Sequence, residues 1–149
     1  MAEVAVIYGS TSDEGVVQGA FDVLKEFGIE YESAVLSAHR QPEATANFAK
    51  SAAGNGIKVI IAGAGLAAAL PGVIAAHTTL PVIGVPIAGG PLNGVDALYA
   101  IVQMPKGIPV ATVGISNAKN AALLAVQILA LSDAALAQKL SDYRADLAK

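Results

Sequence analysis

The sequence of 149 residues contains no cysteine and no tryptophan, and its only aromatic residues besides histidine are four tyrosines and three phenylalanines. The absence of cysteine excludes disulfides, thiol catalysis and thiolate metal sites. Charged residues are also scarce, at 14%, and the formal net charge is -3. A strongly basic surface, the electrostatic signature of nucleic-acid binding, is therefore missing. We expect no nucleic-acid partner.

The length of the chain and its first residues indicate the number of domains and the location of the protein. A chain of 149 residues suits one domain with a sizeable core and is too short for two ordinary domains. We therefore treat 1–149 as a single domain. The opening residues, MAEVAVIYGS, carry neither a basic segment nor a signal-type cleavage pattern, which predicts a cytoplasmic protein.

Apolar residues are abundant, at 54% of the chain. The uncharged run from Val59 to Ala76 is about as long as a membrane-spanning helix. Glycines and a proline interrupt it, so we interpret it as a buried strand, a glycine loop and a short helix, with no membrane partner. We expect the surplus apolar surface to lie in the subunit interfaces of an obligate homo-oligomer.

Apolar, β-rich segments alternate with helical ones throughout the chain, which predicts an α/β three-layer sandwich. The expected strands are continuous apolar runs, typical of a parallel sheet covered on both faces. They are Val4–Tyr8, Tyr31–Leu36, Lys58–Ala62, Val82–Val85 and Val110–Ile115, and the expected helices include Glu14–Phe27, Pro42–Ala53 and Asn117–Leu131.

The last segment, Asp133–Lys149, predicts an extra C-terminal helix beyond the layers of the sandwich. Its apolar residues recur at helical spacing, as Leu136, Leu140, Tyr143 and Leu147. This stripe needs a partner, which is either a neighbouring subunit or the helix's own subunit.

Three strand exits have the composition of a ligand site. In the common strand order 2-1-3-4-5, ligands bind beyond the carboxyl ends of the strands, between the first and third strands. The segments after the first three strands read GSTSD (Gly9 to Asp13), SAHR (Ser37 to Arg40) and GAG (Gly63 to Gly65). We expect these three loops to meet in one crevice.

The first loop offers the hydroxyls of Ser10 and Ser12 and the carboxylate of Asp13 just before a helix. Hydroxyls and backbone N–H groups at a helix start bind phosphate. Asp13 would repel phosphate, so it suits ribose hydroxyls better. The alternative is that Ser12 or Asp13 only caps the helix.

The second loop places the only histidine–arginine pair of the sequence at the exit of a strand. His39 is a candidate general acid or base, because histidine changes its charge near neutral pH. The planar fork of Arg40 suits phosphate, and Ser37 adds a hydroxyl. The alternatives are a structural role for His39 and a surface ion pair for Arg40.

The third loop, continued as GAGLAA, matches a dinucleotide-binding pattern after a strand. That pattern needs an acidic residue about 20 positions further on. No acidic residue lies between Glu43 and Asp96, so we do not expect NAD. The small residues indicate instead a ligand that approaches the backbone closely.

His77 is expected at a helix C-terminus. No metal site is expected, because neither histidine has a carboxylate partner at ligand spacing.

Together these motifs are familiar. GSTSD, SAHRQPE, GAG…ALPG, PVIGVP, LNGVDALYAIVQMPKGIPVATV and NAKNAALLA occur in this order. The combination resembles the N5-carboxyaminoimidazole ribonucleotide mutase family of purine biosynthesis, over nearly the whole chain. The resemblance implies a flavodoxin-like sandwich, an octamer, and an isomerase that uses no metal or organic cofactor.

The implied reaction moves a carboxylate from the exocyclic nitrogen to the ring carbon C4 of an aminoimidazole ribonucleotide, by decarboxylation and recapture of carbon dioxide. His39 matches the catalytic histidine of the family and would shuttle the proton. The implied substrate-binding positions are Ser10, Ser12, Asp13, Ser37 and Arg40, together with the small or apolar wall residues Gly63, Ala64, Gly65, Ala67, Ala68, Ala69 and Leu70.

The sequence departs from the family pattern at two positions. Family members usually read GAGGAAHLPG, whereas this chain has Leu66 for a glycine and Ala69 for the histidine. The related enzymes that carboxylate aminoimidazole ribonucleotide directly also carry alanine at the second position, but Arg40 and the GAG form favour the mutase. A non-catalytic flavin- or nucleotide-binding module is the third alternative. It is disfavoured because the loops offer no aromatic side chain to a flavin.

Overall fold

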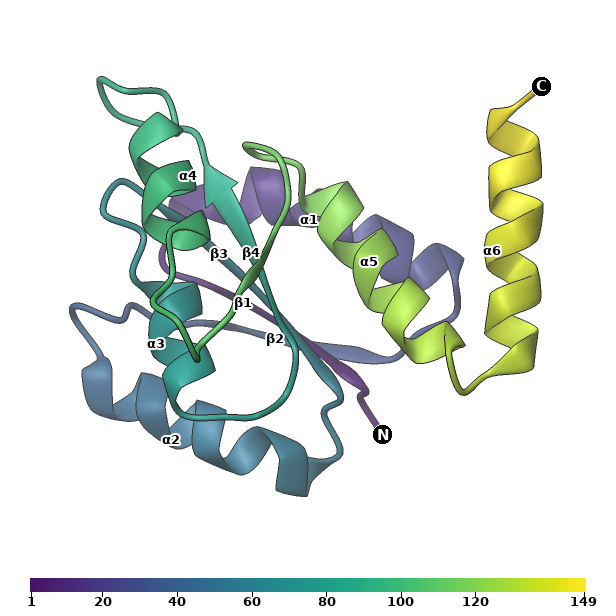
Figure 1. Cartoon of the computed structure of the whole chain (residues 1–149), viewed down its shortest axis with the longest axis horizontal. Helices are drawn as coiled ribbons and strands as arrows, with labels where there is room; N and C mark the ends of the chain where they lie inside the picture. Colours follow the sequence, from purple (N-terminus) through teal and green to yellow (C-terminus); the bar gives the residue numbers. More distant parts are fainter.

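The computed structural model describes residues 1–149 and shows a five-stranded parallel sheet between layers of helices (Figure 1). The strand order is β2-β1-β3-β4-β5, the flavodoxin-like order expected from the sequence. The elements are β1 (Val4–Tyr8), η1 (Thr11–Asp13), α1 (Glu14–Glu26), β2 (Tyr31–Val35), α2 (Pro42–Ala52), η2 (Ala53–Asn55), β3 (Val59–Gly65), α3 (Leu70–Ala76), β4 (Val82–Ile87), α4 (Val95–Val102), β5 (Ala111–Thr112), α5 (Ala118–Ala130) and α6 (Ala134–Leu147).

Side chains of the central strands alternate between two apolar layers, because successive residues of a strand point to opposite faces. On β1, Val4 and Val6 pack with α1 and α5, whereas Ala5 and Ile7 pack with α2, α3 and α4. All four side chains are completely buried. Burial of each valine or isoleucine contributes about 1.5–3 kcal/mol, so the two layers hold the sheet and its helices together.

Helix α5 is buried on more than one side, as its almost uniformly apolar sequence predicts. Its buried face consists largely of alanines, which let the helix pack closely on α1 and on the sheet. The chain enters the helix at Asn117, whose Oδ1 accepts a hydrogen bond from the backbone N–H of Asn120 at 3.0 Å. Asp133 starts α6 in the same way, with a 3.1 Å bond to the N–H of Leu136.

Helix α6 packs on the rest of the chain through its first three turns, from Leu136 to Tyr143. Leu136 is buried in the core, and the ring of Tyr143 lies 5.6 Å from that of Phe27 at the end of α1. Further along, α6 diverges from α5 (Figure 1), and Leu147 is 68% exposed. The own-subunit alternative is therefore confirmed for the first part of the stripe. The end of the stripe is without a partner in the single chain.

The structure corrects the expected strands at their carboxyl ends. Gly63 to Gly65, expected as a loop, continue β3, because the neighbouring strands supply backbone partners for them. Strand β4 also runs two residues longer than expected. The fifth strand is much shorter than Val110–Ile115 and pairs with β4 only at Ala111 and Thr112. Helix α4 lies between the fourth and fifth strands, where a helical segment was expected without stated bounds.

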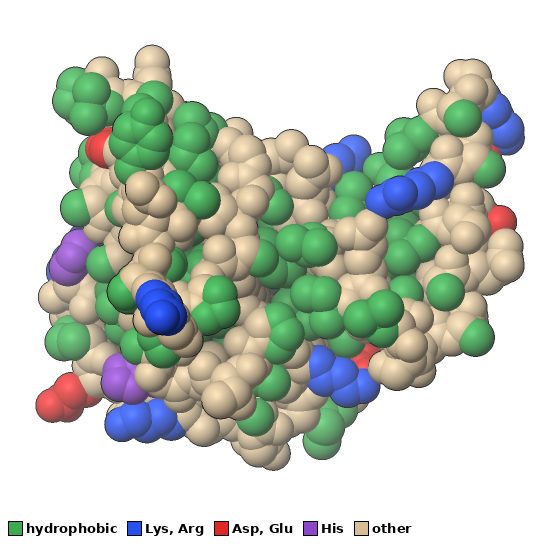
Figure 2. All heavy atoms as spheres, viewed as in Figure 1, with side chains coloured by type: hydrophobic (Ala, Val, Ile, Leu, Met, Phe, Trp, Pro, Cys, Tyr) green, Lys and Arg blue, Asp and Glu red, His purple; other side chains and the backbone are tan.

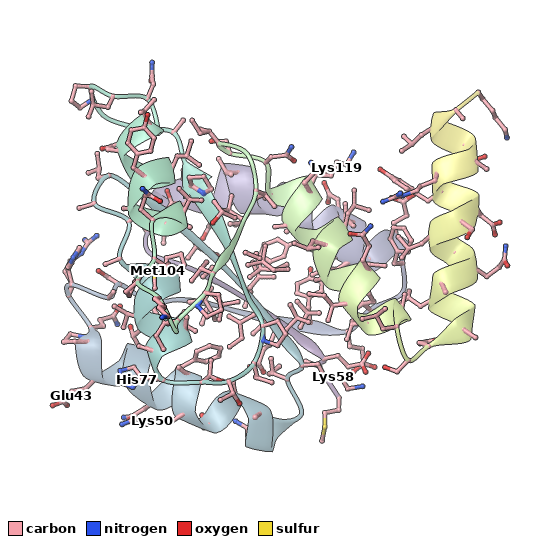
Figure 3. All side chains as sticks on the ribbon, in the orientation of Figure 1. Glu43, Lys50, Lys58, His77, Met104 and Lys119 are labelled. Atoms are coloured by element: carbon pink, nitrogen blue, oxygen red, sulfur yellow. The ribbon has the colours of Figure 1, made fainter.

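Two glycines allow close packing on the face formed by α3 and α4. A β-carbon at Gly84 of β4 would lie 2.4 Å from Cγ2 of Ile101 in α4, so the helix rests directly on the strand. A β-carbon at Gly72 of α3 would lie 3.0 Å from the sulfur of Met104, which lies after α4 and covers α3 (Figure 3). None of the helices is both long and apolar enough to span a bilayer.

Candidate functional site

A cleft of about 750 Å³ lies at the carboxyl ends of the strands, where β1 and β3 are neighbours and the direction of strand order reverses. Ligands of open α/β sheets bind at such a switch point. The cleft brings together four strand exits: residues 9–16 after β1, 37–40 after β2, 64–70 at the end of β3, and 87–90 at the end of β4. The expected meeting of the first three segments is therefore confirmed.

The segment after β1 carries the polar groups of one wall. Ser10 caps the short turn η1: its Oγ accepts a hydrogen bond from the N–H of Ser12 at 3.3 Å and lies 2.9 Å from the Ser12 Oγ. Asp13 occupies the N-cap position of α1 but makes no side-chain capping bond. The alternative that Ser12 or Asp13 serves as the cap is therefore wrong, and the Asp13 carboxylate lines the cleft instead.

Partial burial raises the pKa of the Asp13 carboxyl above its ordinary value, and a backbone hydrogen bond with Ser10 opposes this effect. Burial acts in this direction because it disfavours the charged form. A carboxylate that has lost part of its hydration gains from hydrogen-bond donors that a ligand brings, and the hydroxyls of a sugar are such donors.

The segment after β2 is a tight turn organised by Ser37. The Oγ of Ser37 accepts hydrogen bonds from the backbone N of Arg40 at 3.1 Å and from its Nε at 3.3 Å. Gln41 closes the turn, since its N–H donates to the Ser37 carbonyl at 2.7 Å. The guanidinium is thus anchored through Nε, and none of the chain's ion pairs involves it. The ion-pair alternative for Arg40 is wrong, and its two terminal amino groups are available to a ligand.

His39 lies within this turn, is exposed, and lines the cleft. Its imidazole takes part in none of the side-chain hydrogen bonds that order the turn. The ring is therefore held near the cleft by the backbone of the turn, directly before the anchored Arg40, and both ring nitrogens remain open to a bound ligand.

The opposite wall is small and apolar. Ala64, Gly65, Ala67, Ala68, Ala69 and Leu70 line it, together with Leu66. Gly63, expected in this wall, does not line the cleft. It is buried inside β3, where a β-carbon would lie 3.0 Å from Cδ1 of Ile87, so its lack of a side chain serves strand packing.

Sequence reasoning missed the fourth segment of the cleft, Ile87 to Gly90. The signal was present, since the pair Gly89–Gly90 follows an apolar strand that neighbours β3. Ser116 supports this segment from the loop after β5. Its Oγ accepts a hydrogen bond from the N–H of Ala88 at 3.0 Å, and its own N–H donates to the Pro86 carbonyl at 2.6 Å. Gly9, Val16 and Ala38 complete the lining of the cleft.

His77 lies outside the cleft, at the carboxyl end of α3 (Figure 3), as expected from the sequence. No group of three or more histidine, aspartate or glutamate side chains is arranged to hold a metal ion.

A second hollow of about 640 Å³ separates α5 from α6, well away from these loops. Figure 2 shows hydrophobic side chains along this hollow and a further group over α4. Leu123, Leu124, Leu140 and Leu147 line the hollow. On α4 and the loop before it, Tyr99 is 62% exposed and Leu92 is 57% exposed.

The fold and the cleft together define a doubly wound α/β protein with a candidate ligand site at its switch point. One wall carries hydroxyls, a carboxylate, a guanidinium and an imidazole, and the other wall is apolar. Comparison with known proteins narrows this class. The model of the AIR carboxylase family matches residues 3–149, and the chain belongs to this family.

Individual relatives agree with this assignment. The N5-carboxyaminoimidazole ribonucleotide mutase of Saccharolobus solfataricus is 55% identical over 147 residues, which cover 99% of this chain and 93% of the relative. The mutase of the same name from Thermotoga maritima is 53% identical over 97% of this chain and 84% of its own. Phosphoribosylaminoimidazole carboxylase of Saccharomyces cerevisiae is 54% identical over 94% of this chain, which spans only 24% of that relative.

Solved structures share the fold. The crystal structure of Treponema denticola PurE superposes with a TM-score of 0.88 at 34% sequence identity, covering 97% of this chain and 90% of the other.

Proposed function

We propose that the protein is an N5-carboxyaminoimidazole ribonucleotide mutase, an isomerase of purine biosynthesis. The observation that carries this proposal is the near full-length identity to mutases of that name, at 55% over 99% of the chain in the Saccharolobus relative. The cleft supports it, because its polar wall suits a ribonucleotide and its apolar wall suits carbon dioxide.

Each wall of the cleft binds a different part of the substrate. Arg40, anchored on Ser37, offers its terminal amino groups to the phosphate, and the hydroxyls of Ser10 and Ser12 add donors. Asp13 accepts hydrogen bonds from the ribose hydroxyls. This arrangement directs the aminoimidazole ring toward His39 and the apolar segment 64–70, all of which line the same cleft.

His39 then acts as the proton carrier. In the first step the bond between the exocyclic nitrogen and the carboxylate carbon breaks, its electron pair stays on nitrogen, and the protonated imidazole supplies the proton that nitrogen takes up. Carbon dioxide remains beside the ring. In the second step C4 attacks carbon dioxide, and the neutral imidazole accepts the proton that C4 loses. The histidine ends in its starting state, as a catalyst must.

The direct carboxylase is the second candidate, and two observations favour it: Ala69, and the carboxylase name of the yeast relative. Paired assays without ATP or added metal separate the two functions. One supplies the N-carboxylated ribonucleotide, and the other supplies aminoimidazole ribonucleotide with bicarbonate. We expect fast turnover of the first and activity on the second only at high bicarbonate. Efficient use of the second at modest bicarbonate would establish the carboxylase instead.

Replacing His39 tests the mechanism. His39→Asn should abolish turnover of the N-carboxylated substrate, since asparagine carries no proton at this position. Affinity for the ribonucleotide and the melting temperature should stay close to those of the unaltered protein, because the exposed imidazole supports none of the bonds of its turn. Substantial residual turnover in this variant would remove His39 from the proposed role.

We also propose that the active protein is a homo-oligomer, and an octamer by the family resemblance. The hollow between α5 and α6 and the apolar side chains on α4 support this proposal, since both leave hydrophobic surface uncovered in a single chain. The cytoplasmic location stays a prediction of the sequence.

A further inference from the structure

The turn that carries His39 is closed by a single residue, Gln41. The backbone N–H of Ser37 donates to the side-chain Oε1 of Gln41 at 3.2 Å, and the Ser37 carbonyl accepts a hydrogen bond from the Gln41 N–H at 2.7 Å. Both backbone polar groups of Ser37 are therefore bonded to the same partner. These two bonds close the chain around Ala38, His39 and Arg40.

Gln41 is fixed in turn by a buried side chain of α2. Its carbonyl accepts two hydrogen bonds from Thr45, at 3.0 Å from the backbone N–H and at 2.8 Å from Oγ1. Thr45 is completely buried and is the only polar residue in the buried core. Pro42, the first residue of α2, has its φ fixed by its ring. The closed turn is therefore attached through Gln41 to a firmly held start of α2.

The side chain of Gln41 has no other use in the structure. Gln41 occupies the N-cap position of α2, yet its side chain makes no capping bond to that helix. It does not line the cleft either. Its amide oxygen is directed back along the chain, and the one hydrogen bond that it accepts comes from Ser37. This side chain therefore acts on the turn alone.

The position of His39 depends on this turn, because the exposed imidazole takes part in none of its hydrogen bonds. A general acid or base has to lie within hydrogen-bond reach of the proton that it transfers. A misplacement of about 1 Å costs up to about 100-fold in rate. The group that holds the backbone of the turn therefore also sets the distance over which His39 transfers its proton.

We propose that Gln41 is a positioning residue, which holds the backbone of residues 37–40 and so sets the imidazole of His39 for proton transfer to the exocyclic nitrogen and from C4. This inference rests on the proposed mutase function. Gln41 acts through the Ser37 N–H and makes no contact with the substrate, since it lies outside the cleft lining.

The effect of Gln41 should appear in kcat and not in substrate binding. Arg40 is anchored on the Ser37 hydroxyl through bonds that do not involve Gln41. The other proposed donors to phosphate, Ser10 and Ser12, lie in the segment after β1. Loss of the Gln41 side chain therefore leaves the phosphate contacts in place and loosens the backbone on which His39 stands.

Gln41→Met tests this role, because methionine matches glutamine in length but ends in a methyl group instead of an oxygen. With the N-carboxylated substrate, kcat should fall about 10- to 100-fold. KM should stay within about threefold, as expected when an interaction used only in the chemical step is lost. The melting temperature should stay close to that of the unaltered protein, since the lost hydrogen bond is exposed. Calorimetry with the carboxylated ribonucleotide should still give one binding site per chain.

Two further variants show whether the hydrogen bond itself is responsible. Gln41→Glu keeps an oxygen that accepts the Ser37 N–H, so its kcat should stay within about threefold of the unaltered value. Gln18→Met is the matched control. Gln18 is an exposed glutamine of α1 outside the cleft, and its Nε2 donates to Oδ1 of Asp22 at 2.9 Å. Loss of that bond should change neither kcat nor KM.

An unchanged kcat in Gln41→Met, with an active unaltered protein, would overturn the inference and leave the mutase function standing. An equal loss of kcat in Gln41→Glu would also overturn it, because the hydrogen bond would then not be the cause. A loss of binding sites or of melting temperature that accounts for the lost rate would show a role in folding only, and would overturn it too. An unaltered protein that forms no carboxylated product would refute the proposed function, and the inference with it.

Discussion

Replacement of Arg40 by alanine should weaken binding of the ribonucleotide without weakening the fold. The guanidinium is exposed and belongs to no ion pair, and its one hydrogen bond to another side chain is the 3.3 Å bond from Nε to Ser37 Oγ. Loss of an exposed bond of this kind changes stability by about 0.5 kcal/mol or less. The effect should therefore appear in ligand affinity alone.

The expected loss of ligand affinity follows from the hydrogen bonds that the guanidinium can still donate once its Nε is bound to Ser37. With Nε bound to Ser37, the two terminal amino groups are left to bind the phosphate, and a hydrogen bond to a charged group contributes about 1.5–3 kcal/mol. At about 1.4 kcal/mol per factor of ten, Arg40→Ala should raise the dissociation constant by roughly 10- to 100-fold. Ser37→Ala leaves the charge but frees the side chain, so the loss should be only about two- to tenfold.

Calorimetry with the carboxylated ribonucleotide at low and high salt measures both effects. The difference between Arg40→Ala and the unaltered protein should shrink as salt rises, because exposed charges are screened. Arg144→Ala, which removes an exposed arginine from the other hollow, is the matched control and should bind normally. An Arg40→Ala variant that binds within threefold of the unaltered protein would refute the phosphate role and the use of its terminal amino groups.

Two further predictions concern a carboxyl group and an apolar surface. Burial raises the pKa of Asp13, so the unfolded chain ionises at lower pH than the folded one, and folding loses stability as pH rises through that window. Asp13→Asn should therefore have a higher free energy of unfolding in urea than the unaltered protein at pH 7, and this difference should shrink toward pH 4. A difference in unfolding free energy that grows on acidification would contradict this. Tyr99→Asp, at a side chain that is 62% exposed on α4, should lower the mass measured by light scattering while leaving the circular dichroism unchanged. A monomeric mass for the unaltered protein at micromolar concentration would overturn the oligomer.

The order of elements was predictable because a buried parallel strand leaves a clear pattern. Val4–Tyr8 is apolar at every position and is buried at every position, so its bounds were exact. The end of β3 was not predictable in the same way. Gly63 and Gly65 have no side chains and low strand propensity, yet their backbones pair with Val85 and Ile87 of β4. Backbone pairing with β4 therefore extends β3 to Gly65, and the local sequence contains no pattern that predicts this pairing.

The polar half of the cleft was predictable and the apolar half only in part. Ser10, Asp13 and Arg40 stand out in a sequence with few polar residues, and topology alone brings their loops together. Ala88 and Gly90 carry no reactive side chain, and only the glycine pair after an apolar strand pointed to this segment. Their position in the cleft depends on how far β4 extends and on the neighbouring β3, and both become visible only in three dimensions.

The cleft draws all of its residues from the stretch between Gly9 and Gly90, while the hollow between α5 and α6 and most of the exposed large apolar side chains lie from Leu92 onward. With the proposed function and the proposed oligomer, the chain is divided into a chemical part and an assembly part. A mutation in the assembly part can change how copies associate without altering a single group that touches the ligand. Apart from the shared core, the two parts are tied at the cleft by Ser116, whose left-handed backbone and two hydrogen bonds fix the segment 86–88. A change at Ser116 would therefore reach the cleft through these two hydrogen bonds.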